Sequence, residues 1–468
     1  MFSNYTSEAV GFDSISEGST ETLDSSCQTS ECFTSEKENQ TFYKNTLEVQ
    51  TDVFNREAES PAYDEQELTT FLKRVCPAVI RELDRVEKTK AFSNYKLTEE
   101  DHHDEVKLMH VLSASHLPAL PKLRVSCMAW NCTGAIIGLA FETPVHSDWC
   151  VHDSAIYFYN INKYKFDGFQ PNRVITTASC VTALAMHPFE PAVVAAGTQA
   201  GEVHVWSLLN EGPESGFTNI VTHNDRVTKI EWVSIKDQLL LVTSSLDSYM
   251  FTFKVVSGLR SVTLNDKFVL NEDDKVIKAG VTTFGFSKSP GVFVAGLEGG
   301  ELLHCSAFGA TPMAKRPDSA STFKKPVLKS LGKLLGPVVT IEFSPYHENL
   351  FVTAHTENKF TIRSIDQVTP LREIYTDFEV VGTCWSPSQG NAVLSWGASD
   401  KIVIFNSDNG KKLIELRPED EPDYELSKEP RPVIYNVAFN VKYDNILALS
   451  CHNSKSYIWE IPKFYKAV

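Results

Sequence analysis

The chain has 468 residues, 42% of them hydrophobic, and a formal net charge of −16; this is typical of a globular protein with a large core, and it argues against nucleic acid as the main partner. No apolar run reaches the ~18 residues that a membrane span needs, and the N-terminus has neither the basic nor the apolar region of a secretory signal. We therefore expect a cytoplasmic protein without direct membrane insertion.

The N-terminal segment differs in composition from the rest of the chain. Residues 1–60 are rich in Ser and Thr and carry twelve acidic residues against three basic ones. Such a segment cannot bury enough apolar surface to offset its chain entropy. The composition therefore predicts a disordered tail over residues 1–63.

The dipeptide Gln-Thr occurs three times in this tail, at Gln28–Thr29, Gln40–Thr41 and Gln50–Thr51. The composition of the chain predicts fewer than one such pair at random. A disordered segment can pair its backbone with an exposed sheet edge of a partner, and a dimeric partner would make neighbouring sites cooperate. We interpret the pairs as binding sites, and chance occurrence is the alternative.

Residues 64–88 have the apolar spacing of an amphipathic helix. Asp64 is a plausible N-cap, and Pro77 predicts a kink or a division into two short helices. The stripe either packs on the rest of the protein or docks into another chain; its place between a tail and a polar linker favours docking. The stripe consists of Leu68, Phe71, Leu72, Val75, Val79, Leu83 and Val86.

The next two segments lead into the main domain. Residues 89–105 form a polar linker, in which His102 and His103 among acids suggest a metal site only weakly, because adjacent side chains point in different directions. Residues 106–113 alternate apolar and polar positions, which predicts a strand.

A pattern of three short strands joined by tight turns then occurs seven times. The stretch Val181–Leu208 shows it most clearly, and successive copies begin 42 to 57 residues apart. A four-stranded propeller blade needs ~40–45 residues, with the excess in loops. The repeat predicts an all-β, seven-bladed β-propeller over residues 106–464, closed by strand 106–113 as the outer strand of the last blade, which removes the open edge. The copies begin at Val125, Val181, Val227, Val281, Val338, Val380 and Ile434.

One stretch between blades stands out by its charge. Residues 308–336 are basic in an otherwise acidic protein. This stretch is either an ordinary surface loop or an electrostatic contact with an acidic partner.

The sequence lacks the motifs of catalysis and of cofactor binding. It contains no GxxxxGK[ST], GxSxG or HExxH, and its histidines have no matched base–nucleophile pair. The cysteines form no CxxC pair, and five fall in or beside predicted strands, so we expect buried thiols in a reducing compartment. We therefore expect no enzyme activity, no cofactor and no metal.

The blades resemble WD repeats in their strand and turn layout. Trp206 and Trp459 stand where that family has its terminal tryptophan. Asp247 stands at its turn aspartate, with His223 and Thr243 placed to complete a hydrogen-bonded network. In the other blades most of these positions differ from the family pattern, so the network that stiffens regular WD blades is mostly missing.

A closer resemblance covers most of residues 67–461. The helix run FLKRVCPAVIRELDR, together with VSCMAWNCTGAIIGLAF, AAGTQAGEVHVW and FSPYHENLFVTA, is similar to the WD-repeat intermediate chains of intraflagellar-transport dynein. The resemblance implies a non-catalytic subunit whose propeller binds the dynein heavy chain beside a second intermediate chain. It also implies a hub-type light chain on the Gln-Thr sites, a roadblock-type light chain on the helix, and a role in retrograde transport along ciliary microtubules. The implied location is the cytoplasm and the cilium, at the axoneme and the ciliary base, in association with the cytoskeleton. The alternatives are a generic WD scaffold in a ubiquitin ligase or chromatin complex, or the intermediate chain of another dynein.

Overall fold

The structure is a computed structural model that describes residues 65–88 and, with internal gaps, residues 106–461. It divides into two units, Met1–Lys96 and Leu97–Val468. The Gln-Thr sites and the linker 89–105 lie outside the described residues.

The first unit contains one helix, α1 (Glu65–Lys88), which continues through Pro77. The division into two short helices, one of the two outcomes predicted for Pro77, does not occur. A helix can pass a proline by giving up one backbone hydrogen bond. On the far side of Pro77, the Nε of Arg81 donates to the Pro77 carbonyl at 3.1 Å.

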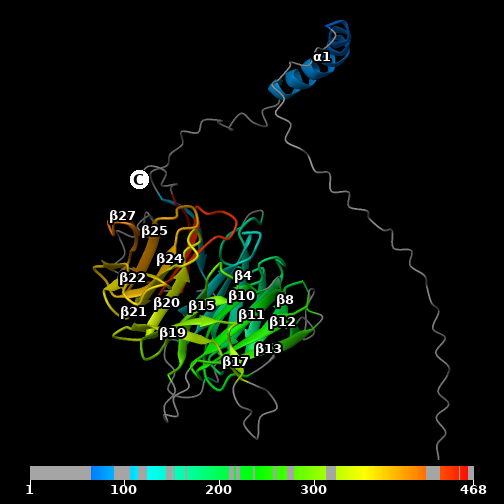
Figure 1. The fold of residues 1–468 in the computed structure, drawn as a ribbon. Helices are drawn as coiled ribbons and strands as arrows, with labels where there is room; N and C mark the ends of the chain where they lie inside the picture. The colour runs from blue at the N-terminus through cyan, green and yellow to red at the C-terminus, as the bar shows by residue number, and fades with distance from the viewer. Residues whose placement is uncertain are drawn as a thin grey trace, which may run out of the picture. The chain divides into compact units, whose positions relative to one another are not determined.

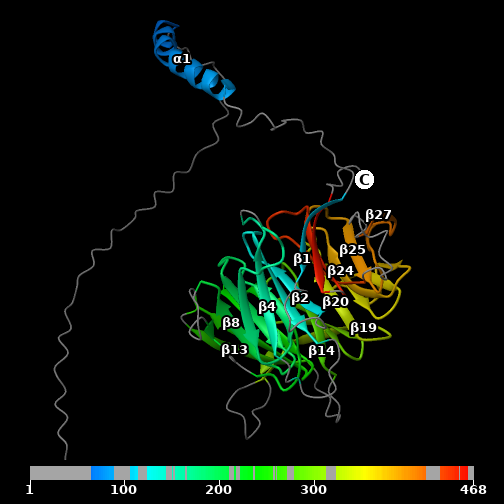
Figure 2. The same cartoon turned by 180° about the vertical axis from the view of Figure 1, so that it is seen from behind.

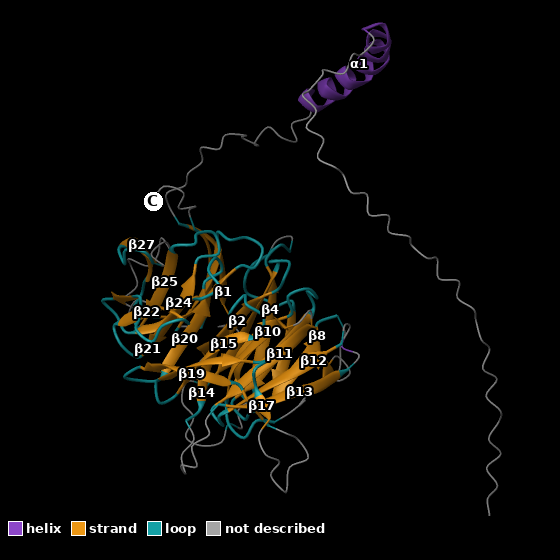
Figure 3. Ribbon diagram, in the orientation of Figure 1, coloured by secondary structure: helices purple, strands orange, loops and turns teal. Residues whose placement is uncertain are grey.

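The second unit is the expected seven-bladed β-propeller, built of seven β-sheets whose four blade strands are antiparallel (Figures 1 and 3). The first strand of each blade contacts the first strand of the next blade, and β28 contacts β2, so the ring is closed. Blades that pack face to face around a ring bury apolar surfaces that a lone blade would expose.

The strands are as follows. Blade 1 contains β2 (Arg124–Trp130), β3 (Ile136–Glu142), β4 (Ser154–Asn160) and β5 (Arg173–Thr177). Blade 2 contains β6 (Val181–Met186), β7 (Val193–Thr198), β8 (Val203–Ser207) and β9 (Gly216–Phe217). Blade 3 contains β10 (Val227–Ile235), β11 (Gln238–Ser245), β12 (Tyr249–Val255) and β13 (Val262–Val269). Blade 4 contains β14 (Val281–Phe286), β15 (Val292–Leu297), β16 (Glu301–Ser306) and β19 (Val327–Lys333).

The last three blades follow the same order. Blade 5 contains β20 (Val338–Phe343), β21 (Leu350–His355), β22 (Lys359–Ser364) and β23 (Arg372–Tyr375). Blade 6 contains β24 (Val380–Trp385), β25 (Ala392–Gly397), β26 (Ile402–Asn406) and β27 (Lys412–Leu416). Blade 7 contains β28 (Ile434–Phe439), β29 (Ile446–Cys451), β30 (Lys455–Glu460) and β1 (Lys107–Ser113).

The core lies between neighbouring blades. One cluster joins Ile156 and Phe158 of blade 1 to Val181, Val194 and Trp206 of blade 2. The second strand of a blade is covered on both faces, so β7 and β25 are buried along their whole length. Outer strands are covered on one face only and alternate in burial, as β5 does.

The N-terminal strand of the propeller completes the last blade. β1 runs antiparallel to β30, from the pair Lys107↔Glu460 to the pair Ser113↔Lys455, and Figure 2 shows it beside the C-terminal end of the chain. Leu112 is 1% exposed. The first and the last strand of the propeller are therefore paired in one blade and close the ring.

The described residues of the basic stretch 308–336 include three strands. Its last residues form β19, the outer strand of blade 4. Before that, β17 (Thr311–Pro312) and β18 (Lys324–Lys325) extend the sheet of blade 3, with β18 parallel to β13. Lys324 forms an ion pair with Asp266 of β13, so one of its positive charges is used within the molecule.

Candidate protein-interaction surfaces

The alternation of strand direction gives the propeller two unlike faces. The turns between the first and second and between the third and fourth strands of each blade lie on one face. Because β1 begins and β30 ends there, we call it the terminal face. The turns between the second and third strands and the connections to the next blade lie on the opposite face.

A hydrogen-bonded network fixes blade 3 at the opposite face, and it joins the three residues that the sequence indicates. The His223 ring lies between Asp247, with Nδ1 3.0 Å from Oδ2, and Thr243, with Nε2 2.9 Å from Oγ1. The same carboxylate accepts the N–H groups of Asn224 and Tyr249. Burial opposes ionisation, but these hydrogen bonds, first that with His223, hold the pKa of Asp247 below its usual range.

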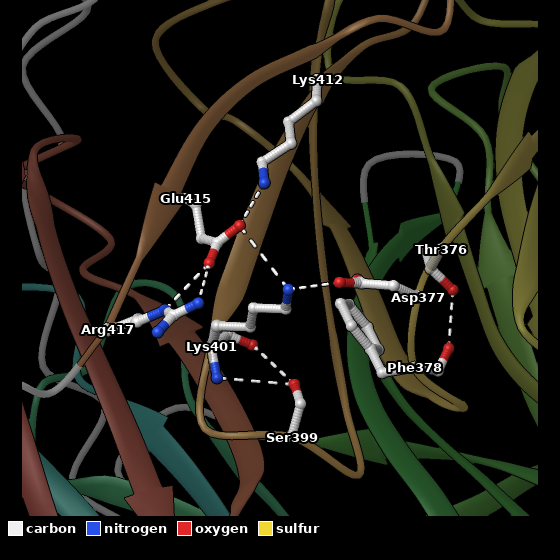
Figure 4. Close-up of polar contacts among 8 residues, drawn as sticks. All are labelled: Thr376, Asp377, Phe378, Ser399, Lys401, Lys412, Glu415 and Arg417. Atoms are coloured by element: carbon white, nitrogen blue, oxygen red, sulfur yellow. Dashed lines mark hydrogen bonds and ion pairs between the residues drawn. The ribbon is translucent and has the colours of Figure 1, made fainter.

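Blade 6 is fastened at the equivalent place by an ion-pair cluster (Figure 4). Ser399 occupies the turn position of Asp247, and Lys401 forms ion pairs with Asp377, on the connection from blade 5, and with Glu415 of β27, 3.6 Å away. Hydrogen bonding to Lys412 first, and then to Arg417, lowers the pKa of Glu415 to about 2. The sequence analysis did not identify this cluster.

Blade 5 repeats the lysine–glutamate pair of blade 6. Lys359 is the first residue of β22, and Lys401 directly precedes β26 in the next blade. The Nζ of Lys359 lies 3.6 Å from Glu373 of the outer strand and 3.6 Å from Glu357. The opposite face is thus stiffened by charge pairs where the WD network is missing. Lys359 and Lys401 each form ion pairs with carboxylates of the propeller itself, so we assign these pairs a role in holding the strands together and not in binding a partner.

The two tryptophans are parts of the core. Trp206 is 6% exposed and stacks on His204, with ring centroids 5.1 Å apart. Trp459 is 2% exposed and lies between blades 6 and 7. Neither belongs to the His223 network, in whose blade Phe251 stacks on the His223 ring at 4.3 Å.

A group of charges lies along the first strands of blades 3 to 5. Lys229 forms an ion pair with Glu231 at 3.1 Å and lies 5.1 Å from the centroid of the Phe284 ring. Burial raises the pKa of Glu342 of β20 to about 7, with Lys229 opposing the rise and Glu231 adding to it. This group joins three blades through side chains on their first strands.

The terminal face carries most of the exposed apolar surface of the propeller. Of fifteen large exposed hydrophobic side chains among its described residues, ten lie in the turns of this face, whereas only Leu335 and Tyr375 lie at the opposite face. Contiguous exposed apolar surface is typical of protein-interaction sites, so this face is the candidate interaction surface of the propeller. The ten are Phe169, Phe189, Leu209, Val256, Phe308, Tyr346, Val368, Leu371, Val441 and Tyr443.

A pocket of about 640 Å³ opens on the terminal face between blades 1 and 2. Its apolar lining includes Phe158 and Val174, on strands of blade 1 next to the turns, and Leu209, in a turn of blade 2. Arg173 is the charged residue in the lining, beside two asparagines. This pocket could not be predicted from the sequence, because its lining residues come from two blades and lie together only when these blades pack.

The helix α1 presents the predicted apolar stripe. Leu68, Phe71, Leu72, Val79 and Leu83 are 40% to 62% exposed, and Val75 is half-buried; the side chain of Val86 lies outside the described residues. No helix in the described part of the chain is long and apolar enough to cross a membrane.

The described residues contain no cluster of three or more potential metal ligands. Cys180, Cys305 and Cys451 are buried thiols, while Cys127 and Cys384 are half-buried. Burial raises the pKa of Cys127 and of Cys451 to about 12, which makes both thiols poor nucleophiles.

Together, the seven-bladed ring, the degenerate WD network and the N-terminal amphipathic helix define a WD-type propeller protein whose surfaces suit protein binding. No family model matches the chain. The chain is similar to the human protein named cytoplasmic dynein 2 intermediate chain 2, at 27% identity over 85% of this chain and 76% of the relative. The mouse protein of the same name is 26% identical over 93% of this chain and 84% of the relative. These matches confirm the resemblance stated from the sequence.

Proposed function

We propose that this chain is a non-catalytic intermediate chain of a dynein motor complex. The observation that carries the proposal is the extent of the similarity to proteins named cytoplasmic dynein 2 intermediate chain 2, which reaches 93% of the chain. The propeller alone does not account for this coverage, so the similarity extends into the segment before the ring.

In this role the propeller binds the dynein heavy chain and the N-terminal region carries light chains, beside a second intermediate chain. A rigid ring with an exposed apolar face suits a subunit that holds other subunits. The setting is retrograde transport along ciliary microtubules, in the cytoplasm and cilium.

The decisive experiment is recovery of the tagged full-length protein from ciliated cells, followed by mass spectrometry. We expect a dynein heavy chain and dynein light chains among the main partners. Recovery of ubiquitin-ligase or histone partners without any dynein chain would contradict the proposal.

The Gln-Thr sites are proposed to bind a hub-type light chain. Replacing Gln28, Gln40 and Gln50 with Ala in the full-length chain should weaken binding of the purified light chain at least tenfold, because strand addition loses its side-chain anchors. Gln367→Ala, in a propeller turn, is the matched control. Equal binding by both variants, measured by calorimetry, would count against these sites.

The stripe on α1 is proposed to bind a roadblock-type light chain. Phe71→Asp places a charge in the middle of the exposed stripe and should abolish binding of that light chain in a pull-down with purified proteins. Lys73→Ala, on another side of the helix, should bind as the wild type does. Binding by Phe71→Asp at wild-type strength would exclude the stripe as the contact.

A further inference from the structure

Two buried thiols meet on the opposite face, where blade 1 joins blade 2. Cys150 lies in the connection between β3 and β4 of blade 1, and Cys180 directly precedes β6 of blade 2. The N–H group of Cys180 donates to the Sγ of Cys150 at 3.2 Å. Contact between the sulfur of one cysteine and the backbone nitrogen of the other leaves the two Cα atoms about as far apart as a disulfide needs, ~4–7 Å.

The backbone around the pair is fixed by both blades. The Cys180 carbonyl accepts the N–H group of Gln199, in the turn between β7 and β8, at 2.8 Å. In the same turn the N–H group of Ala200 donates to the Oγ of Ser179 at 3.2 Å. From blade 1, the N–H group of Thr143, which follows β3, donates to the Sγ of Cys180 at 3.4 Å. The two thiols therefore come from equivalent turns of neighbouring blades and are held against each other.

The hydrogen bonds around the pair favour the thiolate, which is the nucleophilic form of cysteine. Each of the two sulfurs accepts a backbone N–H group, whereas the thiol of Cys305 donates to the Leu303 carbonyl at 3.6 Å. Burial raises the pKa of Cys180, the N–H group of Thr143 opposes the rise, and Cys150 adds to it. The two sulfurs therefore interact, and Cys150 ionises first.

The two thiols also differ in their access to solvent. Cys150 is 7% exposed and Cys180 is fully buried. A small oxidant that enters this junction therefore meets Cys150 before Cys180. In such a pair the more accessible thiolate reacts with the oxidant, and the second thiol resolves the product.

We propose that Cys150 and Cys180 form a redox pair that a hydroperoxide converts into a disulfide. The Cys150 thiolate attacks the peroxide oxygen and the O–O bond breaks. The leaving group takes up a proton and departs as an alcohol or as water, and Cys150 becomes a sulfenic acid. The Cys180 sulfur then attacks the Cys150 sulfur, so that an S–S bond forms and the S–O bond breaks with loss of water. The two thiols give up two electrons, and the peroxide accepts them.

The disulfide ties the β3–β4 connection of blade 1 to the start of blade 2. A cross-link between residues 150 and 180 restricts the unfolded chain and so stabilises the folded state. In a reducing compartment such a disulfide is transient and acts as a redox sensor. The inference concerns the propeller alone and does not depend on the proposed function.

Peptide mapping of the full-length chain tests the pair. The protein is treated with hydrogen peroxide, its remaining thiols are alkylated after unfolding, and linked peptides are identified by mass spectrometry. We expect a link between Cys150 and Cys180, reversed by dithiothreitol, at a dose that leaves the buried Cys305 and Cys451 as thiols. The oxidised protein should have a Tm at least about 3 °C above that of the reduced protein.

Cys150→Ser is the informative variant, and Cys127→Ser, on β2 of the same blade, is the matched control. In Cys150→Ser, Cys180 should stay a thiol at the same dose and the rise in Tm should disappear, whereas the control should behave as the wild type does. If Cys150→Ser does not fold, the mapping of the wild type decides alone. The proposal is wrong if the wild type forms no such link at a dose that fully oxidises the exposed Cys76, or if Cys180 is oxidised as fast in a folded Cys150→Ser variant.

Discussion

At the scale of single residues, the His223 network shows how a few buried hydrogen bonds fix a blade. Asp247 is held between a ring nitrogen of His223 and two backbone N–H groups, so its charge is satisfied on several sides. If the Asp247 carboxylate is replaced by a neutral group, the His223 ring and the two backbone N–H groups lose their charged acceptor. The resulting loss of stability is larger than the net contribution of an ordinary hydrogen bond, because buried donors are left without a full partner.

We expect Asp247→Asn to lower the free energy of unfolding by about 2 kcal/mol at pH 7. The folded-state pKa of Asp247 is lowered, so its contribution is present above the ordinary aspartate pKa of about 4 and is lost as the pH falls through the folded value. Urea unfolding at pH 7 and pH 3 measures both effects. Asp408→Asn, at an exposed turn, is the control, and an equal loss in both variants would contradict the role of the network.

The ionisation of Glu342 changes the stability with pH in the opposite direction to that of Asp247. Its pKa is raised to about 7, so between about pH 4.5 and 7 the folded state binds more protons than the unfolded state and stability falls as the pH rises. Glu342→Gln should therefore stabilise the protein at pH 8 relative to the wild type by on the order of 2 kcal/mol, and much less at pH 5. Thermal unfolding of both proteins at the two pH values measures the difference; the same shift at both would show that Glu342 is ionised throughout.

At the scale of elements, the closing strand β1 carries a large share of the last interface. Leu112→Ala removes a side chain that is 1% exposed between blades 1 and 7 and should lower the free energy of unfolding by about 3 kcal/mol. Lys107→Ala, in the same strand but exposed, should change it by less than about 0.5 kcal/mol. Chemical unfolding measures both; a Leu112→Ala variant as stable as the wild type would mean that the ring holds without this strand.

The sequence predicted the first three strands of each blade because their apolar runs are bounded by turn residues, as in Val181–Met186. It did not mark most outer strands. β23 has one buried residue in four, and its sequence therefore lacks the pattern of a core strand. The extension of blade 3 by β17 and β18 was missed for a related reason, since strands of two residues leave no periodicity.

At the scale of the whole molecule, the interaction face could not be predicted from sequence alone. The pairing of His223 with Asp247 followed from a local pattern, whereas Phe158 of blade 1 and Leu209 of blade 2 line one pocket only because the two blades pack against each other. Phe and Leu side chains elsewhere in the blades are buried. The residue type therefore does not indicate which of them are exposed, and only the packing of the blades decides it.

The proximity of the two ends of the ring allows a circular permutation. A chain in which Ile461 is joined to Val106 by a short linker, with new ends at the exposed turn near Asn409, should fold into the same propeller, because both ends lie on paired neighbouring strands. We expect its circular dichroism spectrum to match that of the parent propeller and its Tm to fall by less than about 5 °C. Loss of the cooperative transition would show that the order of the strands is needed for folding.

The pairing of β1 with β30 also sets when the protein can finish folding during synthesis. β1 leaves the ribosome early, while its partner at Lys455–Glu460 comes roughly 350 residues later, which is tens of seconds at ordinary rates of translation. Over that interval an apolar strand has no native neighbour to pair with, and prematurely terminated chains never acquire one. Completion of this ring therefore requires translation through β30, and protection of β1 from chaperone binding or proteolysis should begin only after Glu460 has left the ribosome.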